Sequence, residues 1–172
     1  KKLFNKKNKL YLGVWCFDYL NSKIKNHKIL NYHWNDRKKL IKDHEYLNEL
    51  YEKILKLLSK KLNQIHQKNF DVSFWRIFIG PWLRFFLEIV YDRYSVINNL
   101  IQDFSNLNLI NDSHFSNEQI YIPFDYEDAT SSYLDDEWNE AFFDLLIKKN
   151  PNMKFKINQI YPQNNKNKKK II

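Results

Sequence analysis

The segment between residues 36 and 66 carries apolar side chains at every third or fourth position. The recurring positions are Leu40, His44, Leu47, Tyr51, Ile54, Leu58, Leu62 and Ile65. Side chains at this spacing share one face of an α-helix. Asn35 or Asp36 can cap the first turn with a side-chain oxygen. The pattern predicts one long amphipathic helix, and any fold of this chain has to cover the apolar face of that helix.

A second apolar stretch, "FWRIFIGPWLRFFLEIVYDRY", occupies residues 74–94. A membrane-spanning helix needs about 20 mostly apolar residues. Arg76 and Arg84 bracket only seven uncharged residues, so the stretch is too charged to span a bilayer. Pro81 donates no amide hydrogen bond, and its ring clashes with the carbonyl of Ile77. We therefore predict an aromatic helix in the core that is kinked near Pro81, or a fresh helix with Pro81 in its first turn.

Short β-rich runs accompany these helical patterns. We predict strands in "LYLGVWC" (10–16), "KILNYHW" (28–34) and "QIYIPF" (119–124), a helical turn or two at 18–25, and a last short strand in "MKFKINQI" (153–160). Ser131 or Ser132 is expected to cap a final helix that carries Trp138 and Phe142 on its inner side. The expected fold class is α/β and helix-rich.

Most of the net charge of +8 is carried by the two ends of the chain. The terminal lysines are Lys1, Lys2, Lys6, Lys7, Lys9, Lys166, Lys168, Lys169 and Lys170. The rest of the chain has 19 basic and 20 acidic side chains and is nearly neutral. We therefore predict a flexible basic arm (1–9), a single domain (10–160) and a basic Asn/Lys-rich tail (161–172), with no specific nucleic-acid site.

Several kinds of site lack support in the sequence. Glycine occurs only at positions 13 and 80, so no phosphate-binding glycine loop can form. No Cys/His pair has the spacing of metal ligands, and we predict neither a metal nor a cofactor. Cys16 is the sole cysteine, which excludes an intramolecular disulfide and fits a cytoplasmic location.

The segment "YHWNDR", residues 32–37, is the most polar cluster beside the end of a predicted strand. Loops at the carboxyl ends of strands are where α/β proteins usually bind ligands. We predict His33 and Asp36 as catalytic residues and Arg37 as a substrate-binding residue. The alternatives are structural. Asn35 or Asp36 caps the helix, His33 packs in the core, and Arg37 lies in water.

Three further residues are candidates for substrate binding. Arg76 and Arg93 suit a carboxylate or phosphate because the guanidinium group is a planar fork of donors. Trp82 could stack on a sugar or a base. The alternatives are a structural salt bridge for each arginine and a place in the core for Trp82.

Three phrases, "YLGVWC", "YHWNDRKKLIKDHEYLNELYEKILKLLSKKLNQIH" and "FWRIFIGPWLRFFLEIVYDRY", carry a resemblance that covers residues 10–94. In this order they resemble the N-terminal region of a bacterial family of transferases encoded in O-antigen and other surface-polysaccharide gene clusters. The resemblance implies a longer parent protein of the glycosyltransferase-B type, of which this chain is part of a Rossmann-like N-terminal half. The nucleotide-sugar site would lie mostly in the other half, and the fragment alone would be inactive.

Two functional hypotheses follow. In the first, the parent protein transfers a sugar from a nucleotide-sugar donor to a polysaccharide-precursor acceptor in the cytoplasm, at or near the inner face of the membrane. His33 or Asp36 would assist deprotonation of the acceptor hydroxyl, and Arg37 or Arg76 would hold an anionic group. In the second, the chain is a non-catalytic helical module whose lysine-rich arms bind polyanions or a partner protein.

Overall fold

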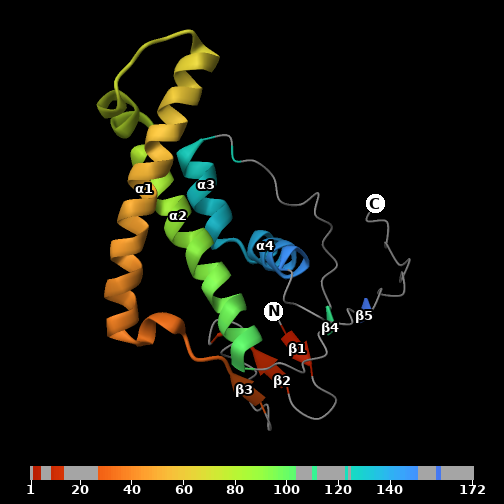
Figure 1. Cartoon of the computed structure of the whole chain (residues 1–172). Helices are drawn as coiled ribbons and strands as arrows, with labels where there is room; N and C mark the ends of the chain where they lie inside the picture. The colour runs from red at the N-terminus through yellow and green to blue at the C-terminus, as the bar shows by residue number, and fades with distance from the viewer. Residues whose placement is uncertain are drawn as a thin grey trace, which may run out of the picture.

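A computed structural model of the chain describes residues 2–4, 9–13, 27–103, 110–111, 123, 125–150 and 158–159. Within these ranges, two long helices form a hairpin, a shorter helix lies alongside it, and a further helix and a few very short strands lie toward its lower end (Figure 1). All structural statements below concern these residues.

The hairpin consists of α1 (Arg37–His66) and α2 (Val72–Asp103). The predicted long helix is confirmed. The Asp36 side chain caps α1 by accepting hydrogen bonds from the amides of Lys38 and Lys39, at 2.9 and 3.4 Å. At the other end, Gln67 has a left-handed backbone (φ 52°), and its backbone N–H donates hydrogen bonds to the carbonyls of Asn63 and Gln64, which closes the helix.

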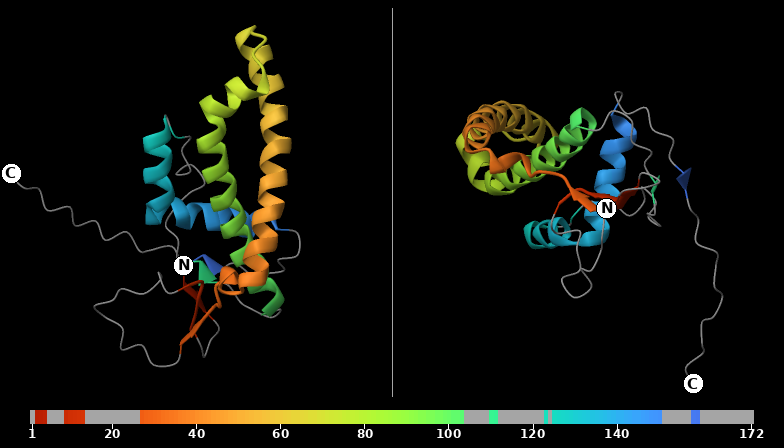
Figure 2. Two further views of the ribbon diagram at one scale, coloured as in Figure 1. Left: turned by 90° about the vertical axis from the view of Figure 1, so that its left-hand side faces the viewer. Right: turned by 90° about the horizontal axis from the view of Figure 1, so that it is seen from below.

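The helix α2 runs through Pro81 without a break. The alternative of a fresh helix at Pro81 is therefore wrong, and the single aromatic helix is confirmed. Its upper part is inclined to its lower part, as expected where a proline removes one backbone hydrogen bond (Figure 2).

Packing between α1 and α2 forms an extended apolar cluster. Its buried members are Leu47, Tyr51, Leu55, Trp75, Leu83 and Leu87. The buried positions of α1 recur every fourth residue from Asp43 to Ser59. Leu40 and His44, which the periodicity places on the covered face, are exposed because α2 meets α1 along this slightly rotated stripe.

Gly80 allows the two helices to approach closely. A Cβ atom at this position would lie 2.5 Å from the Tyr51 hydroxyl oxygen, well inside van der Waals contact. The Tyr51 ring is itself held between Arg76 and Arg84, whose guanidinium carbons lie 5.7 and 4.6 Å from its centroid. The glycine therefore makes room for a tyrosine that cannot easily move away.

Two shorter helices, α3 (Tyr126–Leu134) and α4 (Asp136–Lys149), pack against α2. Asp125 caps α3 and Asp135 caps α4, each through its side chain. The predicted caps Ser131 and Ser132 lie inside α3 instead, since an acidic side chain three residues before an amide serves the same purpose. Trp138 is buried and Phe142 is half-buried, as predicted.

The strands are two or three residues long. β1 (Lys2–Phe4) pairs antiparallel with β2 (Lys9–Tyr11), which pairs parallel with β3 (His27–Ile29). A separate parallel pair joins β4 (Ile110–Asn111) to β5 (Asn158–Gln159). The short 3₁₀-helix η2 (His33–Asn35) follows β3.

The prediction of an α/β fold with a Rossmann-like, glycosyltransferase-B-type half is wrong for the described residues. Four α-helices carry this part of the chain, and its strands are too short to form the layer that a doubly wound fold needs. Leu12 and Leu30, which read as members of buried strands, pack instead against Val96, Ile97 and Phe143 of the helices. Apolar runs that are covered by helices look the same in sequence as strands buried on both faces.

Other predicted elements lie wholly or mostly outside the described residues. These are the helical turns at 18–25, most of the strand at 119–124, and the basic tail at 161–172. Of the basic arm at 1–9, residues 2–4 form β1 and Lys9 begins β2.

Candidate functional site

His33 lies in η2, directly before α1, and its side chain is fully buried. The imidazole Nε2 is 2.9 Å from Oδ1 of Asp92 on α2. This contact joins residues 59 positions apart in the chain. The polar segment that follows β3 is therefore fixed to the middle of the hairpin through a hydrogen bond in the core.

Asp92 is buried, yet it has several polar partners. Its carboxylate accepts hydrogen bonds from His33, from the Tyr32 hydroxyl and from Arg93 Nη1. Burial opposes ionisation of Asp92, but these hydrogen bonds and the Arg93 charge outweigh it and hold its pKa below the ordinary value. Asp92 is therefore an anion at neutral pH. Burial and the hydrogen bond to this anion raise the pKa of Tyr32 far above its usual range.

A second carboxylate lies on the other side of the imidazole. Oδ2 of Asp43 is 3.9 Å from His33 Nδ1, and it accepts hydrogen bonds from Trp34 Nε1 at 3.0 Å and Lys39 Nζ at 2.5 Å. Burial acts against ionisation of Asp43, but the hydrogen bonds from Lys39, Tyr91 and Trp34 outweigh this effect, so the pKa of Asp43 is below its ordinary value. Desolvation and the hydrogen bond to Asp43 raise the pKa of Tyr91 to about 12.

The two ring nitrogens of His33 are thus differently placed. Nε2 is bonded to Asp92, whereas Nδ1 has no hydrogen-bond partner among the described residues. Oδ2 of Asp43 lies 3.9 Å from Nδ1, beyond hydrogen-bond distance, so within the described part of the chain the imidazole is held through Asp92 alone.

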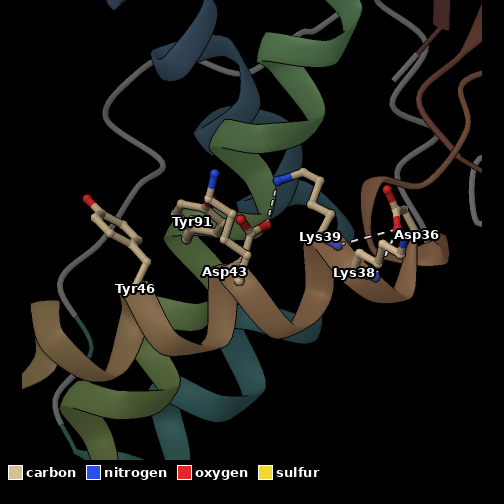
Figure 3. A pocket seen from close by; sticks show the side chains of 7 residues that line it. Asp36, Lys38, Lys39, Asp43, Tyr46 and Tyr91 are labelled. Atoms are coloured by element: carbon tan, nitrogen blue, oxygen red, sulfur yellow. Dashed lines mark hydrogen bonds and ion pairs between the residues drawn. The ribbon is translucent and has the colours of Figure 1, made fainter.

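Each of the two aspartates lines a different pocket. The lysine pocket, drawn in Figure 3, encloses about 610 Å³. It is lined by Asp36, Lys38, Lys39, Lys42, Asp43, Tyr46 and Tyr91. The Arg93 cleft encloses about 460 Å³. It is lined by Tyr32, Asp92, Arg93, Tyr133, Leu134, Asp136, Asn139 and Phe143.

The two pockets differ in how their charged side chains are partnered. In the lysine pocket, Figure 3 shows Lys39 reaching Asp43, while the Asp36 carboxylate is turned to the backbone at the start of α1. In the Arg93 cleft, Arg93 bonds to Asp92 through Nη1 and to Asn139 Oδ1 through Nε at 3.0 Å. The Nη2 group of Arg93 has no hydrogen-bond partner among the described residues, so it can bind an anionic group that enters the cleft.

Comparison with known proteins gives one assignment. The model of the LIC12162 family transferases matches residues 1–172. The chain belongs to this transferase family. No curated protein and no solved structure matches the chain. This match confirms the resemblance to a transferase family.

Within this LIC12162 family chain, the structure brings two of the six predicted site residues together. His33 and Arg93 come from different elements and meet at the Asp92 carboxylate. Asp36 lies at the rim of the lysine pocket, but both hydrogen bonds of its side chain go to backbone amides of α1. Its observed role is that of a helix cap, one of the two alternatives that the sequence leaves open.

The other three predicted residues lie apart from Asp92. Arg37 is exposed and forms no ion pair with the described residues. Arg76 forms a two-pronged ion pair with Glu52 across the hairpin, at 2.6 and 2.8 Å. This pairing lowers the pKa of Glu52. Trp82 is half-buried and stacks on Phe86, with ring centroids 5.2 Å apart. Their predicted roles in binding remain predictions.

Four residues of the site were not singled out in the sequence: Tyr32, Asp43, Tyr91 and Asp92. One signal was available for Asp92, because an acidic residue inside an apolar aromatic helix needs a partner. Asp43 had no such signal, since it is one charge among many along α1. Among the described residues, His33, Asp43 and Asp92 do not form a cluster that could hold a metal ion.

One negative finding concerns the aromatic helix. Neither α2 nor any other helix of the described residues is long and apolar enough to cross a membrane.

Proposed function

We propose that this transferase-family chain acts in sugar transfer during the cytoplasmic assembly of a bacterial surface polysaccharide, with the Arg93 cleft as its reaction site. The donor would be a nucleotide sugar and the acceptor a hydroxyl group of the polysaccharide precursor. One observation carries the proposal: a buried His33–Asp92 pair lies beside Arg93 at a cleft, in a chain that belongs to a transferase family.

The chemistry assigns a role to each group. The acceptor oxygen forms a bond to the anomeric carbon while the bond from that carbon to the nucleotide phosphate breaks. The hydroxyl proton passes to the Asp92 carboxylate, which lines the cleft and is ionised. Arg93 stabilises the charge on the departing phosphate through its remaining donor group, Nη2. His33 does not line the cleft, so it is a positioning residue that orients Asp92.

This assignment changes the roles expected from the sequence. His33 acts through Asp92 rather than on the substrate, and Arg93 takes the anion-binding role that Arg37 or Arg76 was expected to play. Arg76 is less suitable because Glu52 already occupies both prongs of its guanidinium group.

The proposal can be tested by complementing a deletion strain with variants of the full gene and measuring its surface polysaccharide on gels. H33N and R93K should each abolish or strongly reduce polymer. The matched controls are H44N, an exposed histidine on α1, and R84K, an arginine on α2 that bonds to Asn48. Normal polymer in H33N and R93K strains, with protein levels equal to those of the controls, would refute the proposal.

A further inference from the structure

The tip of the α1–α2 hairpin projects beyond the other helices (Figures 1 and 2). This tip is held in a defined shape by Asn63. The Asn63 side chain bonds to both backbone groups of Phe70, at 2.8 and 3.1 Å, and accepts a hydrogen bond from Trp75 Nε1 at 3.0 Å. The turn between the helices is therefore a fixed surface rather than a loose connection.

Aromatic side chains form a row on this tip. The rings of Phe70 and Phe74 stack with centroids 4.1 Å apart, and those of Phe74 and Phe78 are 6.0 Å apart and nearly parallel. Phe78 is 74% exposed, and the neighbouring Ile77 is 81% exposed. A contiguous apolar row of this kind marks a contact surface.

Positive charges predominate around the row. Between residues 53 and 78 the only acidic residue is Asp71, which uses its side chain to cap the start of α2. Of the six basic residues of this segment, Arg76 and Lys53 are ion-paired with Glu52 and Glu49, which lie just outside it. The other four, Lys56, Lys60, Lys61 and Lys68, are exposed and form no ion pair with the described residues. The tip thus combines exposed Phe and Ile side chains with a strong excess of positive charge.

We propose that the hairpin tip docks on the surface of an anionic lipid bilayer. Phe74, Ile77 and Phe78 would enter the boundary between headgroups and acyl chains, while the lysines contact lipid phosphates. The projecting shape fits a flat surface, and the positive charge complements that of anionic lipids. Gly80, two residues after Phe78, packs on Tyr51, which lies 14 residues after the start of α1. At a rise of about 1.5 Å per residue, the contact residues lie at least roughly 20 Å along the hairpin from η2 with His33. The tip therefore anchors the protein without placing the Arg93 cleft at the bilayer.

Co-sedimentation of the purified chain with vesicles tests this proposal. We expect binding to vesicles of phosphatidylcholine and phosphatidylglycerol, weaker binding at high salt, and little binding to phosphatidylcholine alone. The variants I77S/F78S and K60E/K61E should each weaken binding at least roughly tenfold. I41S is the matched control, because Ile41 is 53% exposed on α1 but lies outside the tip. It should bind like the unmodified chain.

Three results would overturn the proposal. The first is no binding to anionic vesicles. The second is binding that both tip variants retain, which would assign it to the lysine-rich ends of the chain. The third is a dimer in light scattering that I77S/F78S dissociates, which would identify the tip as a contact between two copies. Circular dichroism of each variant controls for folding, and all four positions are exposed, so the substitutions leave the core intact.

Discussion

At the scale of single residues, the molecule is organised around one buried imidazole between two aspartates. His33 contacts Asp92 directly and faces Asp43 at 3.9 Å. Both aspartates are ionised because donors from several elements surround them. Two carboxylates in partly buried positions stay charged only where such donors surround them, so the donor residues are part of the site.

The lowered pKa of Asp92 predicts an acid-sensitive fold. A carboxyl group whose pKa is lower in the folded than in the unfolded chain contributes stability at neutral pH. This contribution is complete above the unfolded value of about 4 and is lost as the pH falls through the folded value. The free energy of unfolding, measured with urea between neutral and acidic pH, should therefore decrease below about pH 5. D92N should have a flatter profile, and an unchanged profile would contradict the pairing.

A second prediction concerns the contact between Gly80 and Tyr51. G80A should lower the free energy of unfolding by about 1 to 3 kcal/mol, since the new methyl group overlaps the Tyr51 hydroxyl. In a Y51F background the nearest ring atom is 3.7 Å from the methyl position, an ordinary contact. There G80A should instead stabilise by up to about 1 kcal/mol, because alanine favours helices over glycine. Equal effects in both backgrounds would show that the hydroxyl is not the obstacle.

At the scale of elements, helices were more predictable than strands. The long helix α1 was predictable from its periodicity and its cap, because both signals depend on residues that are near one another in the sequence. The position of its buried face was less certain, since α2 decides whether Leu40 or Asp43 is covered. Three of the expected strands are present, but only as the two- or three-residue elements β2, β3 and β5. Their length was not predictable, because Leu12 and Leu30 have the same apolar character whether a sheet or helices cover them.

The site was only partly predictable for the same reason. His33 and Arg93 stood out as polar residues beside apolar runs, but nothing local indicates that they share Asp92. The pair between Arg76 and Glu52 also spans the hairpin, and its two residues are 24 positions apart. Contacts of this kind depend on how helices meet, which one sequence does not specify.

The start of α1 separates a structural from a catalytic role for Asp36. D36A should lower the free energy of unfolding by about 1 kcal/mol through loss of the cap. D36N should keep both stability and surface polysaccharide, because asparagine caps a helix equally well. Loss of polysaccharide in D36N, with normal stability in urea denaturation, would show that the carboxylate itself takes part in the reaction.

At the scale of the whole molecule, Asn139 connects three helices. Its amide nitrogen bonds to the carbonyls of Tyr133 and Asp135, both at 2.8 Å, and its oxygen accepts the bond from Arg93. N139A removes the side-chain bonds to Tyr133 and Arg93, whereas the Asp135 carbonyl keeps its bond from the backbone amide of residue 139. We expect faster hydrogen exchange of amides in α3 and α4, with α1 unchanged, because the α1–α2 contact has its own apolar core. Uniformly faster exchange would mean that the four helices unfold as one unit.

The central claim is that Asp92 at the Arg93 cleft accepts the proton in the transfer reaction. The most direct test compares D92N with D144N in the deletion strain, because Asp144 is an equally buried aspartate that lies on α4 and does not line the Arg93 cleft. Both proteins are brought to equal levels, and surface polysaccharide is quantified. We predict a loss of about a hundredfold or more for D92N and near-normal polymer for D144N. Equal polymer from the two strains would contradict the account.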